Sequence, residues 1–189
     1  MLFAHRASKL MLDTSPVRRF AEAGLIHEMQ AFLGEKAYAP SPVLQELRDI
    51  SDKFKDIAAV LKAKWPKPAP QDEQRVLDDI FRLQKRYRPP ARSDDPRVNL
   101  GEIAAVQMAI HLGFPLLVAD DELAAKLSRL KLGRISTAML AAEMVALGHL
   151  DENQGWNVWD SATPDDADHD DYERAASRAR LDLALDIYT

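Results

Sequence analysis

The chain has 189 residues, of which 47% are hydrophobic, so it can bury a core as about one domain. It contains no cysteine, which excludes disulfides and thiolate metal sites. No stretch reaches the ~18 consecutive apolar residues of a membrane span, and the N-terminus lacks the pattern of a signal peptide. We therefore expect a cytoplasmic protein that does not enter a membrane.

The net charge of −5 is unevenly distributed along the chain. Residues 1–150 contain 22 Lys and Arg against 19 Asp and Glu, whereas residues 151–189 contain 3 Arg against 11 Asp and Glu. This pattern predicts a folded body over 1–150 and an acidic tail over 151–189, partly disordered or with a terminal helix. Residues 160–173 could screen the basic body or bind a basic segment of a partner.

Short apolar runs alternate with helical patterns in the first half of the chain. The predicted elements are a strand at Lys9–Asp13, a helix from Ser15–Pro16 to Gly24, a helix ending at Gly34, a strand at Ala37–Ala39, and a helix from Ser41–Pro42. Residues 49–64 also read as helical, Trp65–Pro70 breaks that pattern, and an amphipathic helix follows up to Tyr87. These last two helices predict a helical hairpin over 49–90.

The second half repeats the alternation. The predicted elements are a helix from Gly101 to Leu112, a strand in "FPLLVA", a helix from Glu122 to Gly133, a strand in "RIS", a helix in "TAMLAAEMVALG", and an edge strand in "WNVW". Strands that alternate with helices predict an α/β domain, a three-layer α/β/α sandwich with a mostly parallel central sheet and a helical hairpin insertion. Neither a G-x-G-x-x-G nor a G-x-x-x-x-G-K-[ST] motif is present, so the sequence gives no support for a nucleotide cradle.

Acidic residues follow the predicted strands. Asp13 ends the first strand, Glu46 lies one turn into the helix after the second, Asp120 and Asp121 follow "PLLVA", and Glu102 begins the central helix. The carboxyl ends of parallel strands meet at one edge of the sheet, so these side chains are expected to converge there. Carboxylates that converge repel one another unless a cation neutralises them. Oxygen ligands without a Cys or His cluster suit Mg²⁺ or Mn²⁺.

Each acid also has a simpler explanation. Asp13 could favour the dipole of the helix that follows it, and Glu46 could be a solvated helical residue. Asn99 and Glu102 fit a loose capping box, with Asn99 as the N-cap. The simple explanations must hold separately for every acid, whereas one shared site explains all of them together.

Four segments in order carry a family resemblance: "LDTSP", "APSPVLQEL", "NLGEIAAVQMAIHLG" and "PLLVADDELAAKL". Through them the chain resembles PIN-domain proteins, and within these the toxin nucleases of VapC type. The resemblance covers roughly Leu10–Leu147, and the expected hairpin falls in the variable middle of the family. It implies that Asp13, Glu46, Glu102 and Asp121 form the family's catalytic, metal-binding quartet. Thr14 or Ser15 would support a metal-bound water.

The resemblance also implies an activity. It is that of a Mg²⁺- or Mn²⁺-dependent endoribonuclease, a hydrolase of RNA phosphodiester bonds, acting as the toxin of a toxin–antitoxin pair and forming a homodimer. A non-catalytic PIN-like binding module stays open as an alternative. So does a phosphatase or phospho-receiver, although "DTS" lacks the second Asp of a D-x-D motif.

Positively charged residues near the expected site are a further assignment. Cations that offset the acids and contact RNA phosphates are expected among Arg18, Arg19, Lys85, Arg86 and Arg88, although these residues could equally form an ordinary solvated face.

Asp120 and Asp121 could both touch a metal, or one could cap the helix at Glu122, because one N-cap needs only one acid. The family usually has Thr, Ser, Asn or Arg where Asp120 stands. We assign Asp121 a direct metal role and Asp120 a supporting or capping role.

Overall fold

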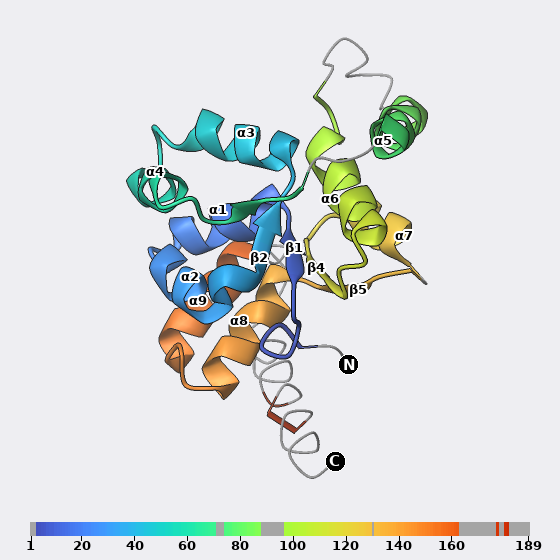
Figure 1. Ribbon diagram of the computed structural model, residues 1–189. Coiled ribbons are helices and arrows are strands. Elements are labelled where there is room, and N and C mark those ends of the chain that lie inside the picture. The colour runs from blue at the N-terminus through green and yellow to red at the C-terminus, as the bar shows by residue number, and fades with distance from the viewer. Residues whose placement is uncertain are drawn as a thin grey trace.

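A parallel sheet of five short strands organises the computed structural model of the chain (Figure 1), which describes residues 3–70, 74–87, 97–129 and 131–162, with 177, 180 and 181. The strands are β1 (Leu10–Leu12), β2 (Ala37–Ala39), β3 (Lys67–Pro68), β4 (Leu116–Val118) and β5 (Gly133–Ile135). Their order across the sheet is β3-β2-β1-β4-β5, and every neighbouring pair is parallel.

Helices cover both faces of this sheet. They are α1 (Thr14–Glu22), α2 (Ile26–Leu33), α3 (Ser41–Ile50), α4 (Lys55–Lys62), α5 (Gln74–Tyr87), α6 (Leu100–His111), α7 (Glu122–Ser128), α8 (Thr137–Ala146) and α9 (Glu152–Ala162), with a short 3-10 turn η1 (Gly34–Lys36). In Figure 1, α1, α2 and α9 lie on the left of the sheet, whereas α5, α6 and α7 lie on the right. The expected α/β class and the three-layer arrangement are confirmed.

The alternation of side chains along each strand divides the core into two. Leu10 and Leu12 of β1 join the cluster formed with α1, α2, α3, α4 and α8, whereas Met11 joins the cluster formed with α6. Leu116 and Val118 of β4 belong to the same cluster as Leu10 and Leu12. Successive residues of a strand point to opposite faces, so a strand between two helical layers must be apolar at every position. This is why "LML" and "LLV" are continuous apolar runs rather than alternating ones.

The helices after β1 and β2 begin earlier than the Ser-Pro pairs predict. α1 begins at Thr14 with Asp13 at the N-cap position, so Pro16 is the third helical residue. α3 begins at Ser41, with Pro40 at the N-cap position. Proline is tolerated throughout a first helical turn because the N–H groups there have no intrahelical acceptor. The shift places Asp13 directly at the junction between strand and helix.

The expected helical hairpin over 49–90 takes a different form. Its helices, α4 and α5, are separated by β3, which pairs with β2 and extends the sheet. α4 packs with α1, α2 and α3, whereas α5 packs with α6, so the two helices belong to different layers (Figure 1). The prediction treated Trp65–Pro70 only as a helix break, because three of its six residues are proline, which is unusual within a strand.

The predicted edge strand in "WNVW" is wrong, because these residues lie within α9. α9 packs against α8 and α1, with Val158 and Trp159 buried. The folded body therefore extends beyond the boundary predicted at residue 150. An ion pair between Arg180 and Glu152 connects a described residue of the tail to α9. The acidic stretch predicted over 160–173 lies almost entirely outside the described residues.

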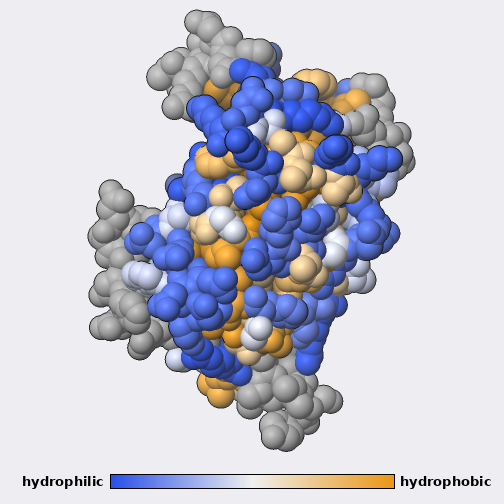
Figure 2. Space-filling view, turned by 90° about the vertical axis from the view of Figure 1, so that its left-hand side faces the viewer, coloured by the Kyte–Doolittle hydropathy of each residue, from blue (hydrophilic) through white to orange (hydrophobic). Residues whose placement is uncertain are grey.

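Figure 2 shows the side of the molecule that carries α2 and α4, where apolar surface is surrounded by hydrophilic residues. Phe32 of α2 and Leu61 of α4 are half-buried and pack against the core.

On α5, in the other helical layer, the side chains of Leu77 and Phe81 are 47% and 58% exposed. Among the described residues, the helices are all too short or too polar to cross a membrane.

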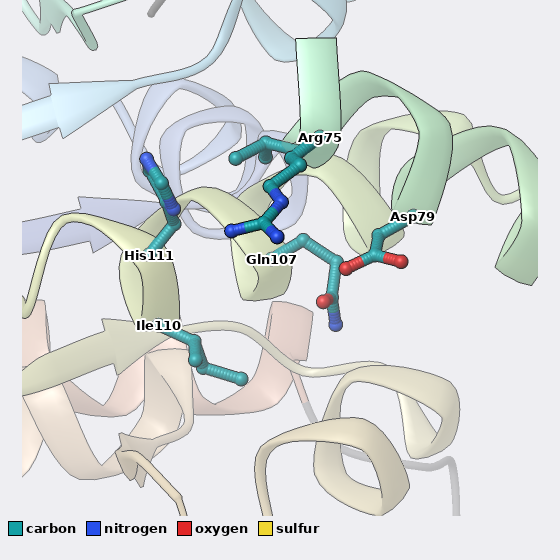
Figure 3. A pocket seen from close by; sticks show the side chains of 6 residues that line it. Arg75, Asp79, Gln107, Ile110 and His111 are labelled. Atoms are coloured by element: carbon teal, nitrogen blue, oxygen red, sulfur yellow. The ribbon is translucent and has the colours of Figure 1, made fainter. Parts of the chain in front are cut away.

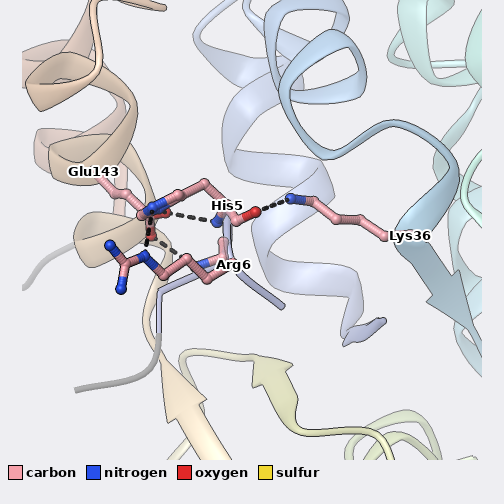
Figure 4. Close-up of polar contacts among 5 residues, drawn as sticks. His5, Arg6, Lys36 and Glu143 are labelled. Atoms are coloured by element: carbon pink, nitrogen blue, oxygen red, sulfur yellow. Dashed lines mark hydrogen bonds and ion pairs between the residues drawn. The ribbon is translucent and has the colours of Figure 1, made fainter. Parts of the chain in front are cut away.

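The N-terminal segment is held against α8 by one buried carboxylate, that of Glu143. Its Oε2 accepts the backbone N–H of Ala4 at 2.9 Å, and its Oε1 accepts the backbone N–H of His5 and His5 Nδ1, each at 2.8 Å. Lys36 Nζ donates to the carbonyl of His5 at 3.1 Å. Figure 4 shows these contacts, which join the N-terminal segment to α8 and to Lys36 just before β2. Glu143 is 2% exposed, so these bonds satisfy groups that water does not reach.

Replacing Glu143 with Ala is therefore expected to lower the free energy of unfolding by about 2–4 kcal/mol, because two backbone N–H groups lose their acceptor. Urea unfolding followed by circular dichroism measures this change. Glu22→Ala is the matched control, since Glu22 forms only surface ion pairs with Arg18 and Arg19 and should change stability by less than ~1 kcal/mol. Equal effects of the two substitutions would contradict the anchoring role of Glu143.

Candidate functional site

Acidic residues from four parts of the chain lie at the carboxyl edge of the sheet. This edge is at the top of Figure 1, where α3 and the beginning of α6 lie. Asp13 follows β1 directly, and its backbone N–H donates to the carbonyl of Val118 at 3.1 Å, which extends the pairing of β1 with β4. Asp121 lies three residues beyond Val118 at the N-cap position of α7. The topology therefore brings the ends of β1 and β4 together, as the sequence predicts for a parallel sheet.

Asp13 is the most deeply buried of these acids, with 2% of its surface exposed. Burial raises its pKa well above the usual range, and the charges of Glu102, Asp121 and Glu46 raise it further. A hydrogen bond from the backbone N–H of Thr14 opposes this rise. The balance favours a protonated Asp13 unless a positive charge is brought to it.

Glu46 projects from α3 toward the same edge. The hydroxyl of Thr14 donates a hydrogen bond to its Oε2. Burial raises the pKa of Glu46, while the bond from Thr14 and the charge of Arg97 lower it. Thr14 therefore fixes the direction of the Glu46 carboxylate, which differs from the water-supporting role expected for Thr14.

Glu102 lies in the first turn of α6 and carries a buried oxygen, Oε2, to which none of the described residues donates a hydrogen bond. Burial, with the charges of Asp121 and Glu46, raises its pKa to about 7. The capping box suggested by the sequence does not form, because Asn99 adopts a left-handed conformation (φ 59°) and donates its side-chain amide to the carbonyl of Tyr87 at 2.9 Å. Helix capping therefore does not explain this acid.

Asp120 and Asp121 have different surroundings. Both oxygens of Asp120 are bound to Thr137, which donates its backbone N–H to Oδ1 and its hydroxyl to Oδ2, each at 2.7 Å. Asp120 thus ties the end of β4 to the first turn of α8. Among the described residues, Asp121 accepts one long hydrogen bond of 3.4 Å, from Ser15 Oγ to its Oδ2. The metal contact proposed for Asp120 is disfavoured by this pairing, which fits the alternative of a supporting role.

The donor set of this site suits a hard divalent cation, although the arrangement is not a finished cage. The charges of Glu46 and Asp121 raise the pKa values of Asp13 and Glu102, and the charge of Asp121 also raises the pKa of Glu46, so these four acids lie close to one another. Within the described ranges, however, no three acidic or histidine side chains are arranged so that they could hold one metal ion together. Among the described residues, Oε2 of Glu102 has no hydrogen-bond partner and Asp121 has a long contact, so these two carboxylates have free coordinating capacity. Binding of one ion by several of these acids would therefore require their side chains to move.

The predicted cations that the structure describes lie on α1 and α5. Arg18 and Arg19 form ion pairs with Glu22 along α1, at 3.4 and 3.3 Å. Lys85 and Arg86 lie in the last turn of α5, in the other helical layer. Arg88 lies outside the described residues.

Arg97 is a cation near the acids that the sequence reasoning missed. It is exposed, pairs with Asp49 of α3 at 3.0 Å, and acts electrostatically on Glu46. Its position just before the helix that carries Glu102 is the feature of the sequence by which Arg97 could have been identified. The prediction passed over it because Arg97 closes a stretch that reads only as a loop.

A pocket of about 200 Å³ opens between α5 and α6, away from the acids. Figure 3 shows Arg75 of α5 extending toward Gln107 and His111 of α6, with Asp79 beside Gln107. His111 ends α6, whereas Glu102 is in its first turn, a separation of roughly 13 Å along the helix axis. The pocket therefore does not contribute to the acidic site.

The raised pKa values predict how stability depends on pH. Glu102, with a folded-state pKa of about 7 against an ordinary value of 4.5, binds its proton more tightly when the chain is folded. This contribution is complete below about pH 4.5 and is lost as the pH rises through about 7. In the presence of a chelator, the free energy of unfolding should therefore be higher at pH 5.5 than at pH 7.5, as measured by urea unfolding.

Glu102→Gln should weaken this pH dependence and raise stability at pH 7.5 by about 1 kcal/mol, because the glutamine carries no charge to desolvate. Asp56→Asn, at an exposed position of α4, is the control and should leave the dependence unchanged. A wild-type protein that becomes more stable from pH 5.5 to 7.5 would contradict the buried, proton-binding state of the acids.

Substitutions at Asp120 and Asp121 separate structure from ion binding. Asp120→Ala should lower the free energy of unfolding by about 1–2 kcal/mol, because Thr137 loses both partners, and should leave Mn²⁺ affinity within about threefold. Asp121→Ala should weaken Mn²⁺ binding at least tenfold with little loss of stability. Urea unfolding and calorimetric titration measure the two effects, and the reverse pattern would exchange the two roles.

Comparison with known proteins identified no relative of this chain. No protein-family model matches the chain, and neither a curated protein nor a solved structure matches it. The functional interpretation depends on the side chains at the sheet edge.

Proposed function

We propose that the protein is a metal-dependent endoribonuclease of PIN type, with Mg²⁺ or Mn²⁺ held by Asp13, Glu46, Glu102 and Asp121. The observation that carries this proposal is the convergence of these four acids, with raised pKa values at three of them and an unpartnered buried oxygen on Glu102. Buried carboxylates that repel one another lower stability, so an arrangement of this kind is a candidate for function.

The roles of individual residues follow from their contacts. Asp13 is the most buried of the acids, and a nearby cation would favour its ionised form by offsetting the burial that raises its pKa. Thr14 holds the direction of the Glu46 carboxylate, and Ser15 contacts Asp121. A divalent cation at this position would lower the pKa of a bound water and stabilise negative charge on a phosphodiester during hydrolysis.

RNA as the substrate, and the role of a toxin with an antitoxin partner, are supported by the resemblance of four sequence segments to VapC-type nucleases. Homodimer formation and action in the cytoplasm are parts of the same proposal. The approach of RNA requires positive charge near the acids, because four carboxylates repel phosphate. Arg97, exposed at the beginning of α6, is the described cation best placed for this purpose.

A non-catalytic binding module is the second candidate. The observation in its favour is that the described acidic side chains are not arranged as a ready ligand set. In that case the edge acids would bind a basic partner rather than an ion. Calorimetric titration of the wild-type protein with Mn²⁺ separates the two, because only the nuclease proposal requires binding.

Asp13→Asn tests the proposal most simply. The substitution keeps the shape of the side chain but removes its charge, so metal-dependent cleavage of a fluorogenic RNA should fall at least ~100-fold. Stability in the presence of a chelator should not fall, because asparagine avoids the cost of ionising a buried carboxyl group.

Asp56→Asn is again the matched control, since it removes one exposed carboxylate on α4 without touching the edge. It should retain wild-type cleavage. Cleavage by Asp13→Asn at the wild-type rate, with the same dependence on Mn²⁺, would refute the proposed function.

A further inference from the structure

Gly101, the second residue of α6, is in close contact with the carboxylate of Glu46 on α3. A Cβ atom added at Gly101 would lie 2.6 Å from Oε1, 2.9 Å from Oε2 and 3.0 Å from Cδ of Glu46. Two of these distances are shorter than a carbon and an oxygen can approach without one of them moving. The space that a side chain at position 101 would need is therefore occupied by the carboxylate.

The backbone does not require glycine at this position. Gly101 lies in a helical turn and does not adopt the left-handed conformation seen at Gly24 or Gly113. Alanine is favoured over glycine within a helix, because glycine has more conformational entropy to lose. The feature of the described structure that excludes a larger residue here is the side chain of Glu46.

The position of Glu46 is fixed by a hydrogen bond from Thr14 and by the packing of α3, the helix that carries it. The hydroxyl of Thr14, at the beginning of α1, donates to Oε2, the oxygen that would lie 2.9 Å from the added Cβ. α3 packs against both α6 and α1, and Arg97 joins Asp49 of α3 to the segment that precedes α6. A methyl group at position 101 would therefore displace the flexible end of the Glu46 side chain, whose Oε2 accepts the hydrogen bond from Thr14.

We propose that Gly101 is a positioning residue for Glu46: its missing side chain lets the Glu46 carboxylate lie against the first turn of α6, beside Glu102, where both can reach one divalent cation. This inference rests on the proposed function, because it concerns how the ion-binding acids are brought together. It assigns a role to a residue that has no functional group of its own.

Gly101→Ala is the direct test, with Mn²⁺ as the probe and binding measured by calorimetry. The variant should bind Mn²⁺ at least tenfold more weakly than the wild type. Its urea midpoint in the presence of a chelator should be equal or higher, because alanine favours the helix. A residue that mattered only for folding would change the two measurements in the same direction.

A compensating substitution provides the second readout. Glu46→Asp in the Gly101→Ala background shortens the carboxylate arm by one methylene and makes room for the methyl group. The double variant should bind Mn²⁺ more tightly than Gly101→Ala alone, although Glu46→Asp alone should weaken binding in the wild-type background. Gln107→Ala, farther along α6 and not among the edge acids, is the control and should bind as the wild type does.

The outcomes separate this inference from the proposed function. If the wild type binds Mn²⁺ and Gly101→Ala binds it equally well, the inference is overturned and the proposed function stands. If Gly101→Ala loses stability together with binding, and Glu46→Asp restores neither, the role of Gly101 is structural and the inference is also overturned. If the wild type binds no Mn²⁺, the proposed function fails and the inference fails with it.

Discussion

The burial of Asp13 at the end of a central strand is the constraint on which the rest of the site depends. β1 is covered by helices on both faces, so the first side chain after it enters a region that water does not reach. A carboxylate there is unfavourable when charged, and three further acids increase its pKa. Positive charge at this position, from a proton or from a metal ion, would offset that cost.

The parallel sheet explains why the acids meet although they are distant in sequence. The residues that follow neighbouring parallel strands lie at the same edge of the sheet, so Asp13 and Asp121 converge through the pairing of β1 with β4. Glu46 and Glu102 arrive differently, from the second turn of α3 and the first turn of α6. Their approach depends on close packing between these helices, which a glycine at position 101 permits.

The sequence predicts most of the central fold, because "LML", "AYA" and "LLV" are short apolar runs bounded by helix signals. It does not predict β3, because the prolines in and around this edge strand indicate a break rather than a strand. It does not predict α9 either, because "WNVW" has the composition of a strand and its tryptophans are covered by α8 only in the folded chain. The acids could be chosen from sequence, but their individual environments could not. The pairing of Asp120 with Thr137 and the contact of Gly101 with Glu46 join residues 17 and 55 positions apart, and no local pattern encodes them.

The central claim is that the acids at the carboxyl edge hold a divalent cation. Anomalous diffraction from crystals of the full chain soaked in Mn²⁺ at pH 7.5 tests it most directly, because the scattering of manganese locates the ion without reference to activity. We expect a peak within coordination distance of Asp13 and at least two of Glu46, Glu102 and Asp121. No peak at this edge, or manganese bound only at other surface acids, would contradict the claim.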